Sequence, residues 1–149
     1  MEHERWMRVA LEEARRAGER GETPVGAALV CGGELVMRAG NRCEEMGDAT
    51  AHAEMLVLRG RRRLTGHTLY VTLEPCPMCA GAIALARPDR VVFGAHDARA
   101  GCCGSVYRLT EDARLGLGGV PAFGGVLAGE CAALLRKSFE LTRGLTPRG

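Results

Sequence analysis

Two short motifs, His52-Ala53-Glu54 and Pro75-Cys76-Pro77-Met78-Cys79, constrain this chain more than any other feature of its sequence. One histidine and two cysteines offer zinc three protein ligands, which leaves the fourth tetrahedral position free for water. Glu54 lies two residues after the histidine, where it can move protons to and from that water without binding the metal. The motifs must therefore meet in space, and together they predict a catalytic zinc site.

A purely structural zinc is the alternative interpretation of these residues. Structural sites hold four protein ligands, commonly as two close pairs. His67 and Cys43 are candidates for a fourth ligand, but His67 begins an expected strand and Cys43 lies in an expected loop. In such a site His52 would need a second metal ligand close to it in the sequence, and Glu54 occupies that place. The pattern therefore favours the open, catalytic site.

Length and composition indicate a soluble globular protein. With 149 residues, the chain can bury one substantial core, and we expect a single domain over residues 1–149. No apolar run approaches the roughly 18 residues that a membrane helix needs, and the N-terminus lacks the layout of a secretory signal. The seven cysteines are an odd number, which argues against a disulfide framework. We expect a cytoplasmic protein with no membrane partner.

Hydrophobic periodicity divides the chain into alternating helices and strands. Pro77 suits the first turn of a helix, and Asp48 or Thr50 could cap the helix that carries Glu54. Adjacent Cys102 and Cys103 between two glycines suggest a tight loop. The expected helices are 3–20, 52–59, 77–86 and 130–142, and the expected strands are 25–31, 34–39, 67–72, 90–94 and, weakly, 105–109, with a polar loop over 40–50. This alternation predicts a three-layer α/β domain.

The two motifs match H-x-E and P-C-x-x-C, the signature of the zinc-dependent nucleobase deaminases. Beyond them, the chain resembles the bacterial tRNA-specific adenosine deaminases along nearly its whole length. The likeness is carried by residues 24–27, 41–42, 50–54, 69–76, 79–82, 90–95 and 129–135. The resemblance implies a cytidine deaminase-like α/β/α fold with a central mixed five-stranded sheet.

The resemblance also implies an activity. Members of this family convert the wobble adenosine of a tRNA anticodon to inosine, and they act as homodimers with one Zn²⁺ per subunit. Transferred to this sequence, the zinc ligands are His52, Cys76 and Cys79. Glu54 would be the proton donor, Asn41 would hydrogen-bond the base, and Val25 and Ala53 would help to wall the pocket. From the residues alone, Asn41 could equally be a turn residue and Val25 an ordinary core residue.

Asp97 is a further candidate for substrate contact. It follows Ala95-His96 just past a predicted strand end, where α/β sheets place ligand loops. Members of the family have an aspartate at the matching place, near the sugar of the substrate strand. A carboxylate can accept a hydrogen bond from a ribose 2′-OH, which DNA lacks. We therefore predict that Asp97 favours RNA over DNA.

Two features depart from the family pattern. The segment between His52 and Cys76 is several residues shorter than expected, and Gly60-Arg61-Arg62-Arg63 replaces a helix end and part of a loop. This change bears on dimer packing and on the edge of the substrate groove. The last helix has one aromatic residue, Phe139, where members often have two adjacent ones. Phe139 is thus the remaining candidate for stacking on a base, a contact worth about 1–3 kcal/mol.

The leading interpretation is a zinc-dependent hydrolase that deaminates adenosine in a tRNA anticodon stem-loop. The target base is extruded, because a stacked base hides the atom under attack. Alternatives are a deaminase of free guanine or cytosine, a shortened or engineered deaminase of single-stranded DNA, and an inactive zinc-stabilised RNA-binding subunit. Glu54 argues against the inactive subunit and Asp97 against DNA. The net charge of +2 is too small to indicate a nucleic-acid partner, although an arginine cluster, Arg59, Arg61, Arg62 and Arg63, could contact phosphate.

Overall fold

Continuous apolar runs form the middle of the molecule. In the computed structural model, which describes residues 2–117 and 119–145, they pair into a five-stranded sheet of spatial order β2-β1-β3-β4-β5. The strands are β1 (Gly26–Cys31), β2 (Glu34–Gly40), β3 (His67–Leu73), β4 (Arg90–Ala95) and β5 (Ala122–Phe123). β1 is antiparallel to β2 and β3, whereas β3, β4 and β5 are parallel. The sheet is therefore mixed, as the family resemblance implied.

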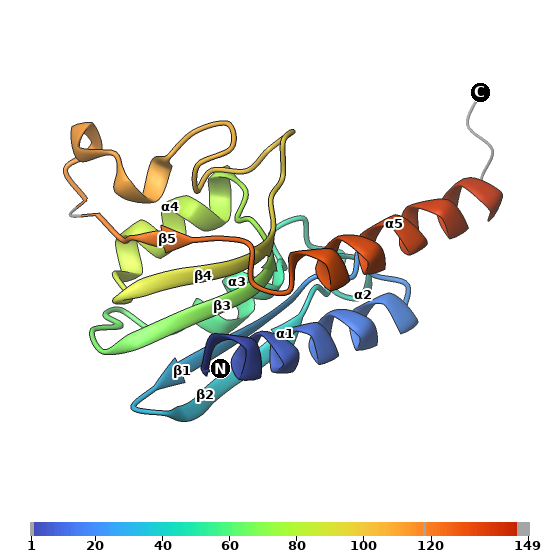
Figure 1. Ribbon diagram of the computed structural model, residues 1–149, viewed down its shortest axis with the longest axis horizontal. Coiled ribbons are helices and arrows are strands. Elements are labelled where there is room, and N and C mark those ends of the chain that lie inside the picture. The colour runs from blue at the N-terminus through green and yellow to red at the C-terminus, as the bar shows by residue number, and fades with distance from the viewer. Residues whose placement is uncertain (1, 118, 146–149) are drawn as a thin grey trace.

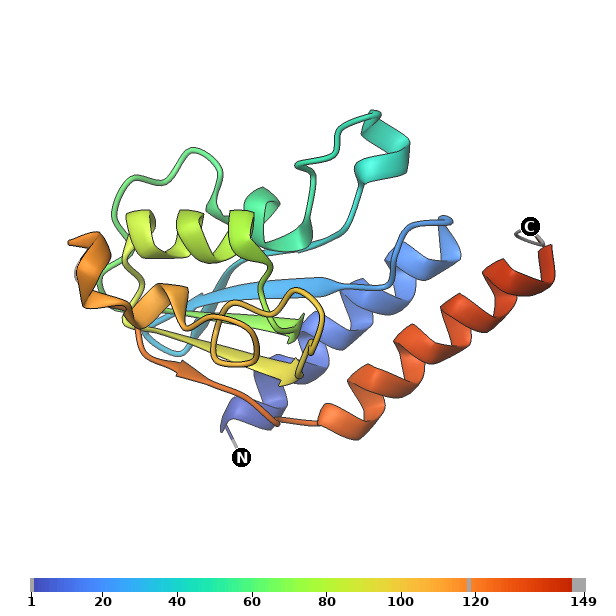
Figure 2. The same ribbon diagram turned by 90° about the horizontal axis from the view of Figure 1, so that it is seen from above.

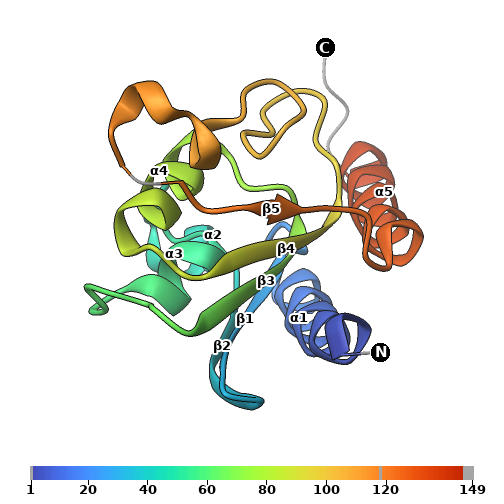
Figure 3. The same ribbon diagram turned by 60° about the vertical axis from the view of Figure 1, so that its left-hand side comes forward.

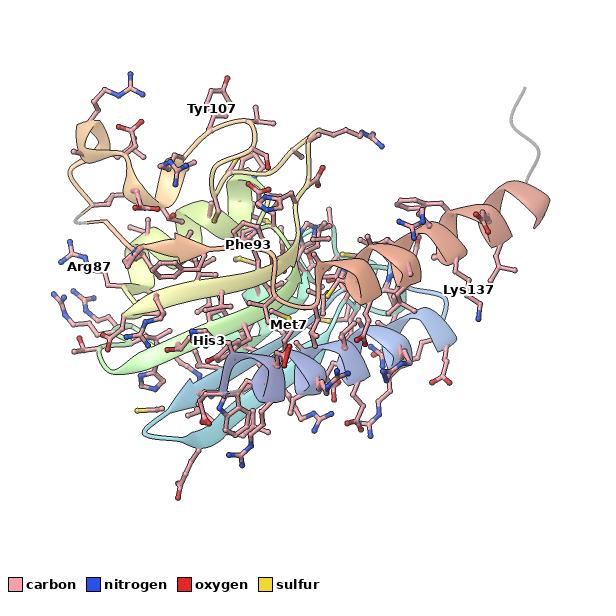
Figure 4. The ribbon with its side chains drawn as sticks, in the orientation of Figure 1. His3, Met7, Arg87, Phe93, Tyr107 and Lys137 are labelled. Atoms are coloured by element: carbon pink, nitrogen blue, oxygen red, sulfur yellow. The ribbon has the colours of Figure 1, made fainter. Side chains whose placement is uncertain are left out.

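Helices cover both faces of this sheet. α1 (Glu2–Glu19) and α5 (Ala128–Leu145) lie on one face, and α3 (Ala53–Leu58) and α4 (Pro77–Ala86) lie on the other (Figures 1 and 3). Each gap is filled by its own apolar cluster: Met7 of α1 belongs to one and Phe93 of β4 to the other (Figure 4). This confirms the predicted three-layer α/β/α architecture. No helix in the described residues is both long enough and apolar enough to cross a membrane.

Two glycines allow α1 to pack directly on the backbone of the sheet. A Cβ atom at Gly26 would lie 2.0 Å from the carbonyl oxygen of Ala10, and one at Gly40 would lie 2.6 Å from that of Glu13. Such distances are far inside van der Waals contact, so the close approach requires glycine at both places. The contact holds the start of β1 and the end of β2, next to Val25 and Asn41.

The loop expected over residues 40–50 contains a short helix, α2 (Cys43–Met46). Its first-turn N–H groups of Glu44 and Glu45 donate to the buried carboxylate of Glu22, at 2.9 and 2.8 Å. The expectation of a plain loop was wrong because the group that caps this helix lies more than twenty residues earlier in the chain. In Figure 2, α2 projects beyond the end of the sheet.

The strand expected over 105–109 is absent from the described residues. This segment turns back on itself instead: Gly104 N–H donates to Tyr107 O, and an isolated bridge pairs Cys103 with Arg108. The fifth strand is β5, which is only two residues long and therefore too short to show a period of its own. The expected tight loop at Cys102 and Cys103 is present, and both side chains are buried.

Candidate zinc and active site

Two helix N-termini bring the zinc motifs together. His52 is the residue immediately before α3, and Cys76 is the residue immediately before α4; both have extended backbone. Cys79 lies in the first turn of α4, which starts at Pro77 as predicted. α3 and α4 lie side by side on the same face of the sheet (Figures 1 and 3), so the three side chains converge.

The distances among these side chains fit a tetrahedral metal site. His52 Nδ1 lies 3.6 Å from Cys76 Sγ and 3.5 Å from Cys79 Sγ, and all the ligand atoms lie within 4.8 Å of one another. Tetrahedral zinc, with Zn–N of about 2.0–2.1 Å and Zn–S of about 2.3 Å, places nitrogen and sulfur about 3.5–3.6 Å apart. The donor set therefore suits zinc in both chemistry and spacing.

Neither candidate for a fourth ligand joins this cluster. Within the described ranges, the site groups only His52, Cys76 and Cys79. The Cys43 thiol points to the carbonyl oxygen of Ala49, and His67 Nδ1 lies 3.1 Å from Thr65 O. Three protein ligands with an open position are the arrangement of catalytic rather than structural zinc sites.

The environment of Cys76 favours the thiolate that a metal ligand requires. A hydrogen bond from Cys79 and a second interaction with the His52 ring lower the pKa of Cys76 to about 4, against the opposing effect of burial. The N-terminal position on α4 acts in the same direction, because the helix dipole stabilises negative charge there. Cys76 is therefore prepared for metal binding.

Glu54 is the second residue of α3 and faces the same cluster. Its side chain is only 4% exposed, and burial raises the pKa of Glu54 to about 7. The positive charge of a bound metal would oppose this rise. A carboxyl group that titrates near neutral pH can both take up and release a proton, which is what general acid–base chemistry requires.

A cleft of about 630 Å³ opens over the cluster. It lies where β3 and β4 end, at the carboxyl edge of the parallel strands, as ligand sites in α/β sheets do. Among its lining residues are His52, Glu54, Cys76, Val25, Asn41, Asp97 and Phe139. Of the other predicted site residues, Cys79 and Ala53 are fully buried and do not line the cleft. Residues that are far apart in the sequence therefore line a single cleft.

Asn41 caps α3 and also lines the cleft. Its Oδ1 accepts a hydrogen bond of 2.7 Å from Ala53 N–H and so caps α3. Neither Asp48 nor Thr50 does so, contrary to expectation, because Asp48 Oδ1 accepts from Thr50 itself in a local turn. Since the Asn41 oxygen is engaged, its NH₂ group is the part of this side chain that remains to donate a hydrogen bond to a ligand in the cleft.

Three further carboxylate residues of the cleft, Glu22, Glu44 and Glu74, were not predicted from the sequence. Glu22 holds α2, and Glu74 accepts hydrogen bonds from the loop that carries Asp97. Burial opposes the charge of Glu74, but its hydrogen bonds from Ser105 and from backbone N–H groups lower its pKa overall. The one available signal was the position of Glu74, directly before Pro75-Cys76.

The arginine cluster lies away from this cleft. Arg59, Arg61, Arg62 and Arg63 line a separate cavity of about 550 Å³, together with residues of α4 that include Leu85 and Arg87. The cluster therefore does not touch the zinc ligands.

Known proteins resemble both the sequence and the fold. Residues 1–95 match the family described as cytidine and deoxycytidylate deaminase zinc-binding region. The tRNA-specific adenosine deaminase of Bacillus subtilis is 46% identical over 94% of this chain and 90% of its own length. A structure solved in work on A-to-I editing by tRNA:A34 deaminases is 44% identical, covers 88% of this chain and 99% of its own, and has a TM-score of 0.83.

Other chemistry occurs on the same fold. A guanine deaminase from Nitrosomonas europaea aligns with a TM-score of 0.73 over 91% of this chain and 83% of its own, at 23% identity. At that identity the likeness shows the fold alone, whereas the matches above 40% extend along the sequence. The chain therefore belongs to the cytidine and deoxycytidylate deaminase family, and within it to the tRNA-specific adenosine deaminases.

Proposed function

We propose that this protein hydrolytically deaminates adenosine to inosine at the wobble position of a tRNA anticodon loop. The observation that carries the proposal is the open three-ligand site, with Glu54 buried beside it, at the base of a 630 Å³ cleft. That volume lies within the range of about 300–1,000 Å³ typical of small-molecule sites. A single extruded nucleotide can enter such a cleft, whereas a paired base cannot.

The protein groups have distinct tasks in this reaction. A zinc ion held by His52, Cys76 and Cys79 would supply a water activated as a nucleophile at neutral pH. Glu54 takes the proton released by the attacking water and delivers it to the ring nitrogen beside the reacting carbon. Glu54 then moves the remaining proton of that water from the hydroxyl now on the ring carbon to the amino group; the carbon–nitrogen bond breaks, ammonia leaves, and the ring keeps the new carbonyl oxygen and the proton on its nitrogen. The Asn41 NH₂ group donates to an acceptor on the base and holds it in place.

The nucleotides around the target base would meet the rim of the cleft. Phe139 on α5 is 48% exposed and lines the cleft, so its ring is available to stack on a base. The family resemblance further implies a homodimer with one zinc per subunit, formed by a single deaminase domain over residues 1–149. A tRNA substrate implies action in the cytoplasm.

An inosine assay on defined substrates tests the proposal. We expect inosine from an anticodon stem-loop with adenosine at the wobble position and no product when guanosine replaces that adenosine. Free adenine, guanine and cytidine should remain unchanged. Product from free bases only would overturn the proposal in favour of a small-molecule deaminase. No product from any substrate, with zinc bound, would favour an inactive RNA-binding subunit.

Asp97→Asn is expected to reduce the preference for RNA. Asp97 Oδ1 accepts from the N–H groups of Arg99 and Ala100, at 3.0 and 3.2 Å. Asparagine can keep both bonds through its own oxygen, so the loop should survive. A charged hydrogen bond to a 2′-OH is worth about 1.5–3 kcal/mol. The ratio of kcat/KM on matched RNA and DNA hairpins should therefore fall roughly 10-fold or more; an unchanged ratio would contradict the predicted role.

A further inference from the structure

Glu74 is a buried carboxylate that accepts four hydrogen bonds from other groups of the protein. Its side chain is 0% exposed, and each of its oxygens accepts two hydrogen bonds. Oε1 accepts from Asp97 N–H at 3.0 Å and from the Ser105 hydroxyl. Oε2 accepts from Cys103 N–H at 3.0 Å and from Ser105 N–H at 2.9 Å. All these donors belong to one loop, residues 97–105.

The loop is shaped around this carboxylate. A Cβ atom at Gly101 would lie 2.4 Å from Glu74 Cδ and 2.5 Å from the Asp97 carbonyl oxygen, so only glycine leaves room for the side chain. The loop contains no helix or strand. A helix or strand would supply acceptors for its own N–H groups, but this loop relies on the Glu74 carboxylate to accept their hydrogen bonds.

The position of Glu74 excludes a direct part in catalysis. It stands two residues before Cys76, yet it is not in the group of metal ligands. Each oxygen already accepts two hydrogen bonds, and the His96 ring lies 3.7 Å from Oε1, so the carboxylate is fully engaged within the protein. Among the residues of the cleft wall, Asp97 is the one that Glu74 holds by its backbone N–H.

We propose that Glu74 is a positioning residue that holds the 97–105 loop so that Asp97 faces the substrate sugar, and that it thereby sets the selectivity for RNA. This inference rests on the proposed function. Glu74 acts by positioning and takes no part in the chemistry at zinc. The Asp97 carboxylate must be held within a few tenths of an ångström to accept a hydrogen bond from the ribose hydroxyl.

Glu74→Gln tests the inference with almost no change in size. The NH₂ group of glutamine would replace one carboxylate oxygen, and it cannot accept the two hydrogen bonds that this oxygen accepts. At least two of the four bonds are therefore lost. We expect the RNA-to-DNA ratio of kcat/KM to fall roughly 10-fold or more, mainly through a higher KM for RNA. Ser105→Ala removes a single donor and leaves the carboxylate intact, so it should lower the ratio in the same direction by a smaller factor.

A double-mutant cycle separates positioning from general damage. Added to Asp97→Asn, Glu74→Gln should change the RNA-to-DNA ratio less than about 2-fold further, because both changes remove the same contact. Zinc content and Tm are measured for every variant. Glu13→Gln, which alters a buried carboxylate on α1 that does not line the cleft, serves as the control and should leave the ratio unchanged.

Each outcome decides the question. Equal losses on RNA and DNA, or additive effects in the cycle, would make Glu74 merely structural and overturn the inference. If Asp97→Asn shifts the ratio but Glu74→Gln and Ser105→Ala do not, the inference fails while the role of Asp97 stands. If Glu74→Gln does not fold, the ratio for Ser105→Ala decides instead. Failure of the proposed function would appear separately, as a wild-type protein that makes no inosine from RNA.

Discussion

Replacing Glu54 with glutamine is expected to lower kcat on an anticodon stem-loop by roughly 10²–10⁴-fold, the usual contribution of general acid–base catalysis. The amide cannot accept the proton of the attacking water or deliver it to the base, although it fills the same space. Single-turnover formation of inosine on a radiolabelled stem-loop measures the loss. Binding of the stem-loop should persist, because Glu54 is almost completely buried and offers little surface to the surrounding nucleotides.

The fold and the metal should survive this substitution. Glutamine has nearly the same size as glutamate, and Glu54 lies outside the group of metal ligands. We therefore expect one zinc per chain and a Tm close to that of the wild type. Glu13→Gln is the matched control: Glu13 forms ion pairs with Arg16 at 3.0 Å and Arg38 at 2.6 Å, so its loss should reduce stability and leave kcat unchanged. Activity of Glu54→Gln above a tenth of wild type would place the proton relay elsewhere.

The parts of the site that could be predicted from sequence are those built from neighbours in the chain. His52 and Glu54 are two residues apart at one helix start, and Cys76 and Cys79 span the first turn of another. Their spacing alone fixes their relative orientation once each helix forms. The same holds for β1, β2, β3, β4 and α4, whose apolar runs and proline predicted their positions closely.

The parts that could not be predicted depend on single hydrogen bonds between distant residues. Asn41 caps α3 across twelve residues, Glu22 caps α2 across twenty-two, and Glu74 reaches Ser105 across thirty-one. Such a bond leaves no periodic pattern in the sequence. Each partner is a single polar residue, which could equally lie in a turn, at a helix end or at the surface. A local rule therefore chose Asp48 or Thr50 as the cap of α3, although a distant asparagine performs that task.

The short connector between the two zinc motifs is accommodated without disturbing the ligands. α3 ends at Leu58, and the chain reaches β3 at His67. Leu64, between them, is only 2% exposed, and its N–H donates to the carbonyl oxygen of Ala86 at the end of α4. The connector is thus anchored at the ends of α3 and α4 that lie opposite the zinc ligands. The arginines of the connector line a separate cavity, and the three ligands remain together.

Loss of zinc is expected to abolish turnover and to destabilise the fold together. A ligand present at about 1,000 times its dissociation constant stabilises the native state by about 4 kcal/mol. Each kcal/mol corresponds to roughly 2–4 °C of Tm for a protein near this size. Exhaustive chelation should therefore lower Tm by about 10 °C and remove inosine formation, and added Zn²⁺ should restore both. Calorimetry and metal analysis on the same samples measure the two effects.

Cysteine variants then show which side chains hold the metal. Cys79→Ala should bind less than one zinc per chain and behave like the chelated protein, because two ligands cannot retain the ion at the wild-type affinity. Cys43→Ala is the matched control, since Cys43 lines the same cleft but lies outside the ligand group. It should keep a full complement of zinc and the same Tm shift on chelation. Full zinc in Cys79→Ala, or its loss in Cys43→Ala, would mean that the ion has a different set of ligands. Because a closed, structural site requires a fourth protein ligand, this pair of variants also tests whether Cys43 supplies one.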